Sequence, residues 1–132
     1  MADGWYEWVK DPVEPKMKQP YFIRLKSQVP MFFAALAEVH PGLEPHEGDG
    51  FVIITAASDK GMVDIHDRRS VVFTPECARE WLKTNLTEIQ AGEMLMQFCQ
   101  PSEYFEWYCV PKAVGNIKNE GCTLIHEVRH LI

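Results

Sequence analysis

The stretch FVIITAASDKGMVDIHDRR, residues 51–69, decides the fold prediction. It opens with an apolar, largely β-branched run from Phe51 to Ile54, which is typical of a buried strand. Small and polar residues follow, and Gly61 interrupts any regular pattern. Titratable residues then crowd the end of the stretch: Asp64, His66, Asp67, Arg68 and Arg69. The sequence therefore predicts a chemically active loop that a rigid strand holds in place.

Length and composition point to an ordinary globular protein. The 132 residues are enough for one domain with one core, so we expect a single domain over residues 1–132. No apolar run approaches the roughly 20 residues that a membrane-spanning helix needs. The first ten residues contain acids and lack the apolar segment of a signal peptide. We therefore expect a cytoplasmic protein with no membrane partner.

Net charge and cysteine spacing limit the kinds of ligand and cross-link that the protein is expected to have. The net charge of -6 argues against a generally basic nucleic-acid binder, but it does not exclude a local groove lined by basic residues. No pair of cysteines has a metal-binding spacing, and a chain without a secretion signal keeps its thiols reduced. We expect free thiols at Cys77, Cys99, Cys109 and Cys122.

Apolar and aromatic runs between turn residues predict most of the secondary structure. Strands are expected at residues 4–10, 21–26, 31–39, 51–54, 71–73, 104–110 and 123–125. The proline- and glycine-rich residues 40–50 predict an exposed loop. The pattern predicts a mostly-β (α+β) protein.

Two short helices are expected late in the chain, at residues 74–84 and 87–98. The first begins with Thr74 as the N-cap and Pro75 at the first helical position, which are the residue types that helix starts favour. Its core-facing residues are predicted to be Cys77, Trp81 and Leu82. The second carries an apolar, methionine-rich face.

His66 is the first candidate for chemistry. An imidazole donates and accepts protons near neutral pH, so histidine is the usual general acid or base. His66 follows the predicted central strand and stands between Asp64 and Asp67, and an adjacent carboxylate can fix the tautomer of the ring. The alternative is a solvent-exposed cluster of ion pairs.

Glu7 is the second candidate. Trp5, Tyr6 and Trp8 surround it in sequence, and Glu7 shares a strand face with Trp5. A carboxylate among aromatic rings loses part of its hydration, which suits a group that exchanges a proton. The alternative is an edge-strand glutamate that points into solvent.

A third set has the side chains that phosphate binding uses, namely hydroxyls, amides and cations. It comprises Thr55, Arg68, Arg69, Lys112, Asn116, Lys118 and Asn119. The aromatic rings of Trp5, Tyr104 and Trp107 could stack on bases, although strand aromatics more often belong to a core.

Metal and cofactor motifs are missing from the sequence. The chain has no nucleophile elbow, phosphate loop or dinucleotide fingerprint. Four histidines lie in predicted loops or the tail and form no convincing ligand set: His40, His46, His126 and His130. We therefore expect neither a metal nor another cofactor.

Three segments resemble the SRAP family, the SOS response-associated peptidases. They are ADGWYEW at 2–8, TAASDKGMVDIHDRR at 55–69 and AVGNIKNEGCTLI at 113–125. The resemblance implies a mostly-β, barrel-like fold with a positively charged groove for single-stranded DNA. The expected fold is therefore a partial SRAP-like β-barrel with one or two short helices inserted late.

The resemblance also implies a chemistry. The family captures abasic sites in single-stranded DNA covalently, through the amine and thiol of an N-terminal cysteine that close a thiazolidine ring with the sugar aldehyde. A glutamate that assists at the amine matches Glu7, and a histidine that protonates the opening sugar matches His66. The DNA-contacting threonine and arginine match Thr55 and Arg68. The family name also carries an older peptidase (hydrolase) proposal beside the lyase chemistry.

The chain departs from the family pattern at its start and at one motif position. It begins at Met1-Ala2, about midway through the family domain, so the cysteine has no counterpart, and Ser70 replaces a usual proline. We expect no thiazolidine from this chain alone, which leaves open whether it is an enzyme. Exposed sheet edges should be covered by self-association or by a separate N-terminal half. The alternative function is a non-catalytic single-stranded-DNA binder or an oligomeric structural remnant.

Overall fold

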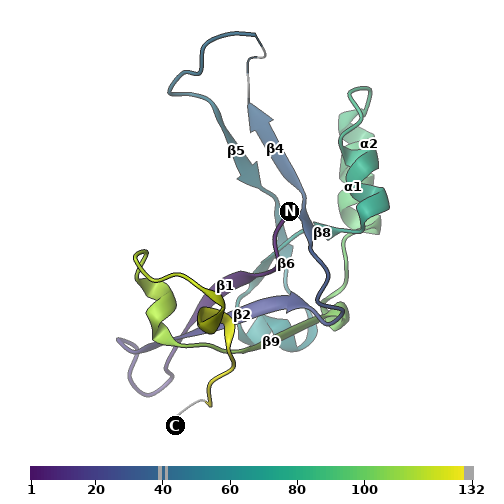
Figure 1. Cartoon of the computed structure of the whole chain (residues 1–132). Coiled ribbons are helices and arrows are strands. Elements are labelled where there is room, and N and C mark those ends of the chain that lie inside the picture. Colours follow the sequence, from purple (N-terminus) through teal and green to yellow (C-terminus); the bar gives the residue numbers. More distant parts are fainter. Residues whose placement is uncertain (39, 41, 130–132) are drawn as a thin grey trace. The chain divides into compact units, whose positions relative to one another are not determined.

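The computed structural model describes residues 1–38, 40 and 42–129, and the chain divides into two compact units (Figure 1). One unit, here called the hairpin unit, contains Met1, Met31–Ala57 and Arg68–Gln100. The other, called the sheet unit, contains Ala2–Pro30, Ser58–Asp67 and Pro101–Ile132. Each unit is described by itself.

The sheet unit is built on a three-stranded antiparallel sheet in the order β1-β2-β9. The strands are β1 (Trp5–Lys10), β2 (Lys18–Leu25) and β9 (Phe105–Cys109). In the register, Ile23 lies opposite both Trp5 and Trp107. Because residues alternate between faces along a strand, each row across the sheet shares one face.

Both faces of this sheet are covered. On one face, the Trp5 and Phe105 rings meet edge to face at 5.7 Å, and the 3-10 helix η1 (Lys60–Asp64) approaches Trp107 through Gly61. On the other face, Phe22 packs against Tyr6 and Tyr108, and the Tyr108 hydroxyl donates a hydrogen bond to the Ile125 carbonyl. The largest side chains that are fully buried in this unit include Ile23, Phe105 and Met62.

Over its described residues, the hairpin unit contains three antiparallel strand pairs and two helices. The pairs are β3 (Phe32–Phe33) with β8 (Val72–Phe73), β4 (Ala35–Glu38) with β5 (Gly50–Ile53), and β6 (Thr55–Ala57) with β7 (Arg68–Ser70). Three backbone hydrogen bonds join the pairs in a ring, because Ala34 donates to Val71, Val71 to Ile54 and Ile54 to Ala34, each at 2.9 Å. We call these three residues, Ala34, Ile54 and Val71, the node, because each of the three chain segments changes its pairing partner there.

The two helices cover the node and complete the core of this unit. Helix α1 (Pro75–Trp81) is capped by the Thr74 hydroxyl, and α2 (Glu88–Gln97) begins with a capping box formed by Thr87 and Gln90. The core cluster contains Ala34, Val71, Phe73 and Met94. Trp81 packs on Phe73 and donates its indole N–H to the Ala35 carbonyl at 3.0 Å.

The mostly-β class with two short helices late in the chain is confirmed. Over the described residues the strands form one three-stranded sheet and separate pairs rather than a closed barrel. The four cysteines are free thiols, as expected. Within the described ranges, no helix combines the length and apolarity needed to cross a membrane.

The central run is a strand, but the prediction that it is buried is wrong. Phe51 is 71% exposed, Val52 62% and Ile53 42%. The reason is that β5 pairs with β4 in a two-stranded ribbon that extends beyond the node, as Figure 1 shows. An apolar run identifies a strand, whereas its burial depends on what other elements cover it.

Other elements also differ from the sequence-based predictions. The strand expected at 31–39 is interrupted at Ala34, where the node forms. The strand expected at 123–125 is part of the 3-10 helix η4 (Cys122–Ile125). Leu82, expected in the core, is 78% exposed because α1 ends at Trp81. The remaining short helices are η2 (Ser102–Tyr104) and η3 (Lys112–Gly115).

Candidate active site and DNA-contacting residues

Glu7 occupies the middle of β1 and is half-buried. As predicted, it shares a face with Trp5, whereas Tyr6 and Trp8 lie on the other face and are each 39% exposed. The register places Glu7 opposite Tyr21 and Tyr21 opposite Cys109. Glu7 is therefore the first of three titratable side chains that lie in a row across the sheet, one from each strand.

Tyr21 is the central member of this row. Burial and the neighbouring Cys109 side chain raise the pKa of Tyr21 to about 12. The phenol therefore stays protonated at neutral pH and can donate a hydrogen bond on the face that carries Glu7. Neither Tyr21 nor Cys109 is predictable as a neighbour of Glu7 from the sequence, because only the strand register brings them beside it.

The loop of His66, residues 58–67, is anchored to the sheet unit at several points. Asp59 accepts a hydrogen bond from Ser102, and Lys60 forms an ion pair with Glu103 at 2.9 Å. A side chain at Gly61 would meet the Trp107 ring at 3.2 Å, so the loop backbone lies directly against that ring. Trp107 shares its face with Trp5 and hence with Glu7. The loop therefore covers the sheet face on which Glu7 lies.

His66 lies just after η1, and its backbone N–H donates to the Met62 carbonyl at 3.1 Å. Its Nδ1 atom lies 3.2 Å from Oδ1 of Asp67. The His66 side chain is 47% exposed, so solvent or a ligand can reach the ring. A carboxylate at Nδ1 favours the tautomer with a proton there, which leaves Nε2 for proton exchange with a ligand.

Thr55 and Arg68 lie together in the hairpin unit, on the paired strands β6 and β7. The Arg68 guanidinium donates from Nε to the Thr55 hydroxyl at 2.9 Å and from Nη2 to the Thr55 carbonyl at 2.7 Å. Both residues are exposed. They form one polar patch that carries a positive charge on a strand surface.

Other residues of the phosphate-binding set have structural contacts. Arg69 is only 8% exposed and donates to the Gln100 carbonyl at 2.6 Å, which argues against a phosphate contact from this side chain. Asn116 accepts from the Lys118 backbone, and Asn119 donates to the Ala113 carbonyl, so these amides stabilise a turn. Lys112 and Lys118 are exposed. Trp5 and Trp107 belong to the packed sheet face, whereas Tyr104 is 54% exposed.

The model of the family described as SOS response associated peptidase (SRAP) matches residues 1–117. The chain belongs to the SRAP family. It is 46% identical over 127 residues to the abasic site processing protein YedK of Escherichia coli, a match that covers 96% of this chain and 55% of YedK. It is 26% identical over 145 residues to the abasic site processing protein HMCES of Pongo abelii, covering 90% of this chain and 40% of that protein.

A solved structure agrees with the fold. A phage-related protein from Bordetella bronchiseptica aligns with a TM-score of 0.71 and 43% identity, over 84% of this chain and 51% of that one. The chain therefore spans about half the length of the SRAP relatives that it matches. The matched range includes the four candidate site residues: Glu7, Thr55, His66 and Arg68.

Proposed function

We propose that this chain takes part in processing abasic sites in single-stranded DNA, as the names of its SRAP relatives suggest. The observation that carries the proposal is the sheet face shared by Glu7 and the loop of His66, together with the family match. The expected cytoplasmic location belongs to the same proposal. A covalent band formed by the chain itself would show that it is an enzyme.

The chemistry of an abasic site explains why a carboxylate and an imidazole suit this role. The sugar must open to an aldehyde, and an amine must lose a proton as it adds to the carbonyl carbon. Glu7 is proposed to accept the proton from the attacking amine. His66 is proposed to donate a proton from Nε2 of its imidazolium form to the departing ring oxygen, while its Nδ1–H stays with Asp67. The amine belongs to an N-terminal cysteine in the family pattern, and no residue here matches it.

Thr55 and Arg68 are proposed to hold the DNA backbone. The two hydrogen bonds to Thr55 fix the plane of the Arg68 guanidinium. A fixed guanidinium presents its remaining N–H groups in the geometry that phosphate oxygens accept. Such contacts position a strand without reading its sequence, which suits a protein whose target is a missing base.

The test is a denaturing gel after incubation with a single-stranded oligonucleotide that carries one abasic site. The samples are this chain alone and this chain fused to the part of YedK that precedes the matched region. The fusion should give a covalent band and the chain alone should not. In the fusion, His66→Ala should slow band formation about 100-fold or more, as expected for loss of a general acid.

The matched control is His126→Ala in the same fusion, because His126 is also exposed and lies in the sheet unit. It should form the band at the rate of the parent fusion. Equal rates for His66→Ala and His126→Ala would remove the role assigned to His66. A band from the chain alone would mean that one of its own amines reaches the aldehyde. If both the chain and the fusion bind the oligonucleotide and neither gives a covalent band, the alternative of a non-catalytic DNA binder is favoured.

The proposal also includes a protein partner for the hairpin unit. The β4–β5 ribbon exposes Leu36, Phe51 and Val52. Exposed apolar strands of this kind promote association between chains. We propose that a second copy of the chain, or a complementing N-terminal half, covers the ribbon.

A further inference from the structure

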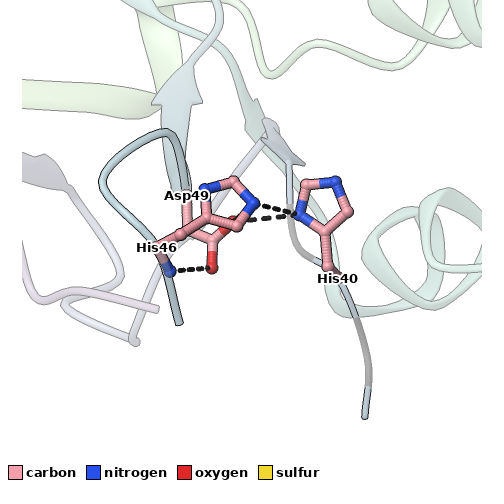
Figure 2. Close-up of side chains that lie close together, drawn as sticks. All are labelled: His40, His46 and Asp49. Carbon is pink, nitrogen blue, oxygen red and sulfur yellow. Dashed lines mark hydrogen bonds and ion pairs between the residues drawn. The ribbon is translucent and has the colours of Figure 1, made fainter. Parts of the chain in front are cut away.

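Two histidines and an aspartate converge at the tip of the β4–β5 hairpin, in the loop that connects the two strands (Figure 2). Nδ1 of His40 lies 3.0 Å from Nε2 of His46 and 3.1 Å from Oδ1 of Asp49. Nε2 of His46 lies 3.3 Å from the same Asp49 oxygen. Three donor atoms thus form a nearly equilateral triangle. The histidines form no convincing ligand set in the sequence, because their spacing alone does not show that Asp49 lies beside them.

Protons alone leave this triangle either crowded or with two lone pairs facing each other. The Gly48 backbone N–H donates to Nδ1 of His46 at 3.2 Å, so the proton of the neutral His46 ring is on Nε2 and points into the triangle. If the triangle holds only that proton, lone pairs of His40 and Asp49 face each other. If His40 also carries a proton on Nδ1, both N–H groups converge on the single Oδ1 atom of Asp49, and the two nitrogens that carry them lie only 3.0 Å apart. A cation at the centre would engage all three lone pairs at once.

The distances fit a transition metal. Nitrogen and oxygen ligands bind zinc at about 2.0–2.2 Å, so neighbouring ligands of a tetrahedral zinc lie about 3.3 Å apart. The observed separations of 3.0–3.3 Å need an expansion of only a few tenths of an ångström. The side chains of His40, His46 and Asp49 are 40%, 53% and 23% exposed, which leaves a route for a metal and a fourth, solvent ligand.

The backbone of the loop orients two of the three ligands in advance. The Asp49 N–H donates to the His46 carbonyl at 2.9 Å and closes a turn. The His46 N–H donates to Oδ2 of Asp49 at 3.1 Å, so the carboxylate is held with Oδ1 toward the histidines. This contact is the kind of outer-shell hydrogen bond that supports metal ligands. His40 completes the set from the other side of the loop (Figure 2).

We propose that His40, His46 and Asp49 form a binding site for a divalent transition metal, with zinc as the reference ion. Two imidazoles and one carboxylate, without a thiolate, suit zinc and its neighbours in the first transition row and disfavour soft ions such as Cu(I). The site shares no residue with the candidate DNA-processing residues, and it does not depend on the proposed DNA chemistry. It would clamp the two ends of the hairpin loop together.

Metal binding must rearrange one proton. Zinc on Nε2 of His46 moves the ring proton to Nδ1, and the hydrogen bond from Gly48 to that atom is lost. His40 binds through Nδ1, so its proton is on Nε2. The two rings therefore take opposite tautomers in the metal-bound state, which is a signature that adventitious surface binding would not produce.

The experiment is a titration of the whole chain with zinc chloride, followed by isothermal calorimetry and by ¹H–¹⁵N correlation spectra of the histidine rings. One zinc ion per chain should bind at micromolar concentrations, with opposite tautomers at His40 and His46. The double variant His40→Ala/His46→Ala should lose more than about 100-fold in affinity, beyond the loss from outer-shell changes alone. Asp49→Asn, which keeps the shape of the side chain, should weaken binding in the same direction.

Two controls separate this site from other zinc ligands in the chain. His126→Ala and Cys122→Ser each remove an exposed potential ligand elsewhere and should leave the affinity unchanged. Cobalt substitution should give visible bands without thiolate charge transfer. The proposal is overturned if a folded wild-type chain binds no zinc, if the double variant retains the affinity, or if both rings keep one tautomer. Circular dichroism of each variant confirms that the fold is intact.

Discussion

Arg68 holds Thr55 through two hydrogen bonds, one to the hydroxyl at 2.9 Å and one to the backbone carbonyl at 2.7 Å. The register places Arg68 opposite Ala57, so Thr55 is its diagonal neighbour on the same strand face. The two residues proposed to contact DNA are therefore one structural unit. A change at either residue should alter the other.

The first prediction concerns this pair. Arg68→Lys keeps the charge but loses the two directed hydrogen bonds, so binding of single-stranded DNA should weaken several-fold at low salt. Arg68→Ala should also reduce the slope of log affinity against log salt by about 0.7–1, because one phosphate contact is lost. Fluorescence anisotropy over a salt series measures both effects. Arg79→Ala, an exposed arginine on α1, is the control and should change neither quantity.

The second prediction compares two glycines. A side chain at Gly4 would overlap the Phe22 ring and the Ile23 carbonyl, so Gly4→Ala should destabilise the protein by about 1–3 kcal/mol. Gly92 lies within α2, and an added methyl group there would meet open space, so Gly92→Ala should stabilise by about 0.5–1 kcal/mol. Urea unfolding measures the two changes. The same sign for both would contradict the packing described around Gly4.

The third prediction concerns alkaline pH. The pKa of Tyr21 is raised to about 12 in the folded chain, whereas a tyrosine in the unfolded chain has a pKa of about 10. Between these values the folded state keeps a proton that the unfolded state releases, so the stabilisation is complete below about pH 10 and falls as pH rises toward about 12. The melting temperature should decline over this window, and Tyr21→Phe should make the decline shallower. Tyr104→Phe, at an exposed position, should leave the profile unchanged.

The fourth prediction concerns the β4–β5 ribbon. Analytical ultracentrifugation should show association that increases with concentration, and Phe51→Asp should reduce it because Phe51 is 71% exposed on the ribbon. Ile117→Asp changes another apolar residue, which is 97% exposed in the sheet unit, and it should have no effect. A monomer at all concentrations would leave the complementing half as the proposed cover.

Local signals made much of the fold predictable. The Thr74 hydroxyl accepts a hydrogen bond from the Cys77 N–H, Thr87 forms a capping box with Gln90, and both helices begin where expected. Burial and the pairing of distant strands could not be predicted from local sequence in this way. The apolar run at Phe51 is a strand, but nothing in its own sequence shows that only β4 pairs with it over the described residues. The change of partner at Ala34 depends on Ile54 and Val71, which are distant in sequence.

The candidate site shows the same difference between what local sequence predicts and what only long-range pairing reveals. Motifs selected Glu7 and His66, and the structure places Glu7 and the loop of His66 on one sheet face. Tyr21 and Cys109 have no motif, and only pairing across three strands puts them in line with Glu7. Asp49 was overlooked for a similar reason, since a turn brings it to His46 and the hairpin brings both to His40. Long-range pairing carries information that spacing along the chain does not.

The row from Glu7 through Tyr21 to Cys109 has a consequence for quality control during folding. If β1 slipped by one residue along β2, Tyr6 or Trp8 would face Tyr21, and Glu7 would move to the opposite face of the sheet. A misregistered molecule could still pair its backbone, yet its carboxylate would point away from the loop of His66. Correct alignment and a complete site are therefore acquired in the same step, so any reactivity that depends on Glu7 also reports how many molecules have folded in register.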